Sequence, residues 1–118
     1  MKKITRREDF DVVMSAGVLA TTAHFALHAH INNPPLPFRI GAVVPKRWAK
    51  RATTRNSIKR QIYNLAGRGP QAFANMDLVI RLRKTFPTNE YISATSRKLK
   101  TDVRMELEQL LAKPIKHS

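Results

Sequence analysis

The sequence contains no cysteine, and its acidic residues are few and unevenly placed. Without cysteine the chain can form neither disulfides nor thiolate metal sites, which suits a reducing compartment. Asp and Glu total 8 against 22 Lys and Arg, and no acid lies between Asp11 and Asp77. The formal net charge is +14, so the middle of the chain is an uncompensated positive field that should attract a polyanion.

Long apolar runs are also missing. No run approaches the roughly 18 residues of a membrane span, and Met1-Lys2-Lys3 leads into a charged segment where a signal peptide would be apolar. We therefore expect a cytoplasmic protein without a membrane partner. A chain of 118 residues, 42% of them hydrophobic, fits a single domain spanning residues 1–118.

Hydrophobic periodicity predicts six elements in the order αββαβα. The expected segments are a helix over 7–16 stopped by Gly17, strands over 22–31 and 38–44, a helix over 52–66, a strand over 76–82, and a helix from about 89 to 112 ended by Lys113-Pro114. The first two strands are expected to form a hairpin, and a strand-helix-strand unit should span 38–84. This order predicts an α+β, single-domain two-layer sandwich with helices on one face of a small sheet, and it leaves room for an extra short strand.

The predicted helix over 52–66 separates a narrow apolar arc from a basic one. At about 100° per residue, Ile58, Ile62 and Leu65 share one side. The side facing away carries Arg55, Asn56, Lys59, Arg60 and Tyr63. Cations four residues apart repel each other, and no acid lies nearby to pair with them, which indicates an anionic partner. Arginine suits phosphate oxygens and stacks on exposed bases, so RNA is favoured over a membrane or an acidic protein.

Other chemistry has little support in the sequence. His24, His28 and His30 alternate along the strand expected over 22–31, but no acid in that stretch could orient an imidazole, which favours a structural or RNA-stacking role over a metal site. The basic segment lacks the paired carboxylates that hold metals in many protein nucleases. Trp48 fits either a loop position at the edge of the core or stacking on RNA.

An ordered set of segments resembles the bacterial ribonuclease P protein component. The run Arg55-Asn56-Ser57-Ile58-Lys59-Arg60, preceded by Lys46-Arg47 and Lys50-Arg51-Ala52, is similar to that family's arginine-rich helix. The segments 8–17, 25–28, 39–44 and 77–81 look like its first helix and its following strands. The resemblance extends from about residue 3 to residue 112.

The resemblance implies a fold and a set of RNA contacts. The implied fold is like that of ribosomal protein S5 domain 2, with a left-handed strand-helix-strand crossover. The implied contacts to a catalytic RNA are Lys46, Arg47, Lys50, Arg51, Arg55, Asn56, Lys59 and Arg60. A cleft for the 5′ leader of precursor tRNA falls on Phe10, Met14, Ala26 and His28.

The resemblance also implies the chemistry of the complex. The protein would be a subunit of an endoribonuclease for tRNA 5′ maturation, whose catalytic centre and Mg²⁺ belong to the RNA and the substrate phosphates. No catalytic residue, metal ligand or obligate protein partner is expected in this chain.

Three positions depart from the family pattern, and other functions stay open. Ser57 and Tyr63 stand where basic residues are usual, and Met14 replaces an aromatic residue. A structural RNA-binding protein of the ribosome would share the small size and strong basicity. An autonomous protein nuclease is less favoured, because its carboxylates are missing.

Overall fold

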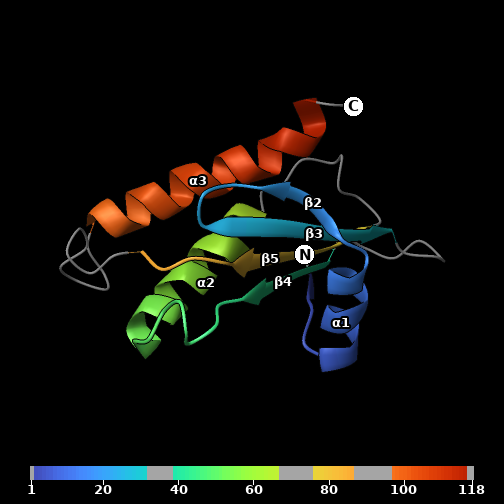
Figure 1. Ribbon diagram of the computed structural model, residues 1–118, viewed down its shortest axis with the longest axis horizontal. Coiled ribbons are helices and arrows are strands. Elements are labelled where there is room, and N and C mark those ends of the chain that lie inside the picture. The colour runs from blue at the N-terminus through green and yellow to red at the C-terminus, as the bar shows by residue number, and fades with distance from the viewer. Residues whose placement is uncertain (1, 32–38, 67–75, 87–96, 117–118) are drawn as a thin grey trace.

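The computed structural model describes residues 2–31, 39–66, 76–86 and 97–116, which form three helices and five strands (Figure 1). In chain order these elements are β1 (Lys2–Lys3), α1 (Arg7–Ser15), β2 (Val18–Thr21), β3 (Phe25–Ile31), β4 (Arg39–Val43), α2 (Ala52–Ala66), β5 (Met76–Leu82) and α3 (Arg97–Lys116). The predicted bounds of α2 and β5 are confirmed. The predicted mixed α+β class is confirmed as well, with two short strands, β1 and β2, added to the expected order.

The sheet has the strand order β1-β4-β5-β3-β2, with β5 in the middle. β5 pairs in parallel with β4 and antiparallel with β3, so the predicted hairpin between the two strands before α2 is wrong. Leu78, Val79 and Ile80 are fully buried, which shows that β5 is apolar on both faces. A strand of that kind is most stable at the centre of a sheet, where it separates β3 from β4.

The unit β4-α2-β5 is a parallel crossover, as the strand-helix-strand spacing predicted. Its left-handed sense and the likeness to ribosomal protein S5 domain 2 stay predictions.

Two hydrophobic cores lie on opposite faces of the sheet. The larger core joins β3, β4 and β5 to α2 and α3 through side chains that include Phe25, Leu27, Ile58, Ile62 and Leu107. The smaller core joins Val13 of α1 to Ile4 and Val79. Because Val79 alternates with Leu78 and Ile80 of the larger core, α1 covers the other face. The prediction that the helices share one face therefore holds only for α2 and α3 (Figure 1).

The helix ends follow local chemistry. Gly17 has φ 101°, a left-handed conformation that glycine adopts readily, and it stops α1 as predicted. α3 runs on to Lys116, so Lys113-Pro114 does not end it. Proline removes only one backbone hydrogen bond there, close to a helix end where bonds are few. The expected start of this helix, residues 89–96, lies outside the described residues.

None of the described helices is long and apolar enough to cross a membrane.

Candidate RNA-binding surfaces

The segment between β4 and α2 is a fixed turn that presents cations. The backbone N–H groups of Trp48 and Ala49 donate to the carbonyl of Pro45, at 3.1 and 3.0 Å. Ala49 is buried in the larger core, and half-buried Trp48 packs against it. The basic side chains of the segment, which are Lys46, Arg47, Lys50 and Arg51, are all exposed. Trp48 thus lies at the edge of the core, and the Arg47 guanidinium lies 5.3 Å from its ring centroid.

α2 continues this basic surface. Ile58 and Ile62 point into the larger core, which fixes the rotation of the helix. Asn56 and Arg60 are exposed, and Lys59 is half-buried. We call the eight predicted contacts of the turn and the helix the α2 surface; they are Lys46, Arg47, Lys50, Arg51, Arg55, Asn56, Lys59 and Arg60. In the described part of the chain, no carboxylate forms an ion pair with any of them.

Within the α2 surface, the Arg55 side chain also stabilises the turn before α2. Its Nη1 donates to the carbonyl oxygens of Ala49 and Lys50, at 3.0 and 2.8 Å. These bonds tie the turn to the first turn of α2 and use part of the guanidinium. Arg55 therefore holds the exposed cations of the turn in place, in addition to its own charge.

A further cation, Lys3, lies beside α2 and was not among the predicted RNA contacts. The Lys3 Nζ lies 4.4 Å from the centroid of the Tyr63 ring. β1 pairs in parallel with β4, and this pairing places Lys3 beside α2. A positive charge thus lies next to Tyr63, a position where the resemblance implies a basic residue. The Lys2-Lys3 pair is the sequence signal, but only the strand pairing places it.

The residues predicted for the leader cleft lie together on the side of the sheet that α1 covers, which we call the α1 face. Phe10 and Met14 are half-buried at the edge of the smaller core. The Phe10 ring lies directly over Gly41, where a Cβ atom would overlap it. Ala26 and His28 are 1% and 4% exposed. The two α1 residues are therefore accessible, whereas the two β3 residues lie beneath the surface.

His28 is held at both ring nitrogens. Nδ1 lies 3.1 Å from the Gly17 carbonyl oxygen, so Nδ1 carries the proton and donates. Nε2 then accepts a hydrogen bond from Nε of Arg81, at 3.3 Å. Burial first, and then the charge of Arg81, lower the pKa of His28 below its ordinary value, which keeps the ring neutral. His28 is thus a buried link between α1 and β5, and it does not offer an open stacking surface.

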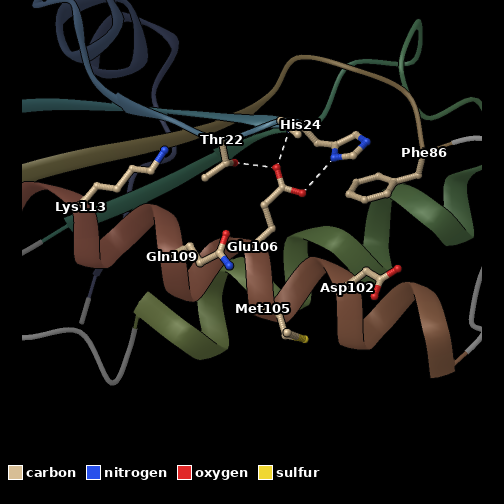
Figure 2. Close-up of a pocket in the computed structure, with 9 residues that line it drawn as sticks. Thr22, His24, Phe86, Asp102, Met105, Glu106, Gln109 and Lys113 are labelled. Atoms are coloured by element: carbon tan, nitrogen blue, oxygen red, sulfur yellow. Dashed lines mark hydrogen bonds and ion pairs between the residues drawn. The ribbon is translucent and has the colours of Figure 1, made fainter.

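The three histidines do not share one strand face as predicted. His24 lies in the turn before β3, where its Nδ1 is 2.9 Å from Oε2 of Glu106 (Figure 2). Its ring stacks on the Phe86 ring, with 4.0 Å between the ring centroids. Glu106 also accepts a hydrogen bond from the Thr22 hydroxyl, at 2.6 Å. The acid that orients this imidazole comes from α3, far along the chain, so the local sequence could not show it. His30 is half-buried, and its Nδ1 has no hydrogen-bond partner in the described part of the chain.

Two acids near the α1 face, Asp9 and Asp77, pair with Arg39. Arg39 of β4 donates from Nε and Nη2 to the two Asp77 oxygens, at 2.8 and 2.6 Å. Its Nη1 reaches Asp9 of α1 at 3.3 Å. These carboxylates, Asp77 above all, raise the pKa of Arg39. Asp9 and Asp77 are therefore committed to an ion-pair network, and the described residues hold no group of three or more His, Asp or Glu side chains able to bind a metal ion.

Comparison with known proteins identifies the family. The family model described as ribonuclease P matches residues 1–113. The chain belongs to the ribonuclease P protein family. The ribonuclease P protein component of Ralstonia pickettii is 33% identical over 108 residues, which cover 92% of this chain and 75% of the relative. That of Paraburkholderia xenovorans is 29% identical over 111 residues, covering 94% of this chain and 78% of the relative.

Solved ribonuclease P proteins share the fold. The Staphylococcus aureus RNase P protein has a TM-score of 0.74 at 20% identity, over 96% of this chain and 94% of that one. The Thermotoga maritima RNase P protein, solved in complex with 1-(4-fluorophenyl)-2-thiourea, has a TM-score of 0.68 at 26% identity, over 92% of this chain and 95% of that one. Family and fold are thus established for this chain, a component of an endoribonuclease complex. The individual RNA contacts stay predictions.

Proposed function

We propose that this protein is the subunit of ribonuclease P that binds the catalytic RNA and the 5′ leader of precursor tRNA in the cytoplasm, and so assists the endonucleolytic removal of the leader. Family membership supports this proposal. The observation that carries it is the α2 surface, whose cations have no carboxylate partner in the described part of the chain. A fold that accepts such repulsion is suited to a polyanion.

The α2 surface is the proposed anchor on the catalytic RNA. Its cations are exposed or half-buried on α2 and on a turn that Arg55 fixes. Each phosphate contact releases counterions, so the binding should weaken steeply as salt is added. Asn56 adds a neutral donor and acceptor among the cations.

The α1 face is the proposed site of the leader. Phe10 and Met14 offer accessible apolar surface, on which an unstacked base can pack. Ala26 and His28 are buried, so their role is to shape the floor beneath the RNA.

Hydrolysis itself is assigned to the RNA subunit. Mg²⁺ would be held by the catalytic RNA and by substrate phosphates, and this chain would supply no ligand of its own. A protein of net charge +14 shares in the neutralisation of crowded phosphates, so it should lower the magnesium concentration that cleavage needs.

The test is cleavage of precursor tRNA by the catalytic RNA at limiting magnesium, with and without the protein. We expect a clear gain in rate with the protein, and a smaller gain with a variant carrying Lys59→Gln and Arg60→Gln. A folded protein that gives no gain would refute the proposal. Cleavage by the protein without any RNA subunit would indicate an autonomous nuclease, and enrichment of ribosomal RNA among copurified RNAs would indicate a structural protein of the ribosome.

A further inference from the structure

Arg39 and Arg81 both lie on the α1 face, but they differ in whether a carboxylate pairs with them. Arg39 is neutralised by Asp77 and Asp9. Arg81 of β5 forms no ion pair with any described carboxylate, and its side chain donates a hydrogen bond from Nε to neutral His28. A half-buried arginine without an acid retains a full positive charge at the protein surface.

The sheet register places Arg81 among the residues predicted to meet the leader. Arg81 lies directly opposite Ala26 on β3 and beside Val43 on β4. Val43 borders the smaller core together with Phe10 and Met14. The small side chain of Ala26 leaves space across the strand for the long arginine side chain. Arg81 therefore lies beside Ala26 and bonds to His28, two of the four residues assigned to the leader. Its neighbour Val43 packs against the same small core as the other two, Phe10 and Met14.

His28 restricts the orientation of the Arg81 guanidinium. The Gly17 carbonyl fixes the proton of His28 on Nδ1, which leaves the lone pair of Nε2 facing Nε of Arg81. That bond uses the inner edge of the guanidinium. Among the described residues the terminal Nη groups form no hydrogen bond or ion pair, so they remain as a pair of charged donors.

We propose that Arg81 binds a backbone phosphate of the single-stranded 5′ leader, and that His28 is its positioning residue. The inference rests on the proposed function and names the cation of its leader site. Phe10 and Met14 would meet the bases, while Arg81 would meet the phosphate between them.

The first test compares precursor tRNA with mature tRNA as ligands of the complete protein–RNA complex. Arg81→Gln removes the charge and keeps a chain of similar length. We expect about a tenfold loss of affinity for precursor tRNA and none for mature tRNA, because one charge-assisted hydrogen bond is lost. The salt slope for precursor tRNA should fall by about one. Lys100→Gln, an equal charge loss at an exposed site on α3, should leave the ratio of the two affinities unchanged.

The second test identifies the phosphate. Precursor tRNAs carrying one neutral methylphosphonate at successive leader positions are bound to the wild-type and Arg81→Gln complexes. We expect the methylphosphonate at one leader position to lower the affinity of the wild-type complex about tenfold. The same substitution should leave the affinity of the Arg81→Gln complex unchanged. If that position costs both complexes equally, another residue holds the phosphate and the inference is wrong.

The third test concerns His28 as a positioning residue. His28→Phe fills the same space but offers no acceptor to Arg81. The affinity ratio of precursor to mature tRNA should fall in the wild-type background and should fall no further in the Arg81→Gln background. Independent, additive losses would show that His28 acts through packing alone, and thermal unfolding of each variant shows whether the fold is retained.

The outcomes separate this inference from the proposed function. A wild-type complex that prefers precursor tRNA, together with an Arg81→Gln complex that keeps the same preference and salt slope, would overturn the role of Arg81 and leave the function standing. A wild-type complex without any preference for the leader would overturn both.

Discussion

The α2 surface and the α1 face are both proposed to bind RNA, yet they differ in how far their basic side chains are paired with carboxylates. On the α2 surface the cations are exposed or half-buried, repeat at helical spacing and have no described carboxylate beside them. On the α1 face Arg39 is paired with two acids, His28 is neutral and bonded on both sides, and Arg81 keeps its charge. The α2 surface therefore attracts RNA over a long range, and salt weakens this attraction. The α1 face instead offers short-range contacts at fixed positions.

The largest effect should come from breaking the ion pair of the α1 face. The Asp77 side chain is 4% exposed and accepts two hydrogen bonds from Arg39. Asp77→Ala should lower the free energy of unfolding in urea by about 3 kcal/mol, because it leaves Arg39 poorly compensated. Glu8→Ala, which removes an exposed acid of α1, should cost less than about 1 kcal/mol. Similar losses in the two variants would show that the network is not a structural element.

Removal of the Phe10 ring should separate the two RNA ligands. Phe10→Ala should weaken the binding of precursor tRNA by about 1–3 kcal/mol, the range of one base stacked on an aromatic ring, and should affect mature tRNA much less. Met105→Ala, at a 55% exposed residue of α3, is the control for loss of an apolar surface side chain. Equal losses for precursor and mature tRNA would place the leader elsewhere.

Two arginines of α2 should differ in what they contribute. Arg60→Ala should lower the salt slope for binding to the catalytic RNA by about one, with little change in stability, because Arg60 is exposed. Arg55→Ala should also lower the free energy of unfolding by about 1 kcal/mol, because its hydrogen bonds to Ala49 and Lys50 are lost. A salt slope that Arg60→Ala leaves unchanged would mean that no phosphate lies at that residue.

The smallest effect should be a pH dependence of stability from His28. Its pKa in the folded protein is lowered from 6.5, so the unfolded chain takes up the proton first as the pH falls. Stability from this residue should therefore decrease as the pH falls below about 6.5 and level off below the folded pKa. His28→Phe should show a weaker pH dependence in urea unfolding measured from about pH 8 to about pH 5. Parallel curves for the two proteins would contradict the neutral, buried state of His28.

Local patterns in the sequence predicted those elements whose own residues determine them. The arc of Ile58 and Ile62 predicted α2, the apolar run of β5 predicted a buried strand, and Gly17 predicted the end of α1. The strand order depends on which segments pair across the whole chain. The position of β5 between β3 and β4 therefore required the folded structure, as did the location of α1 on the far face.

The candidate sites show the same division. The basic arc of α2 could be predicted because its period is local, and the carbonyl bonds of Arg55 refine it without moving it. The partners of His24 and His28 could not be predicted, because Glu106 and Arg81 come from other elements. The separate uses of Arg39 and Arg81 likewise depend on sheet register, which places Asp77 opposite Arg39.

The central claim is that the α2 surface meets the catalytic RNA while the α1 face meets the leader. The chain has no cysteine, so Arg60→Cys and Met14→Cys each provide one unique site for a short photo-crosslinker. In the complete complex with precursor tRNA, we expect the label at position 60 to crosslink to the catalytic RNA and the label at position 14 to crosslink to leader nucleotides. Crosslinks from both positions to the same RNA, or from position 14 to the body of the tRNA and not to its leader, would contradict this division.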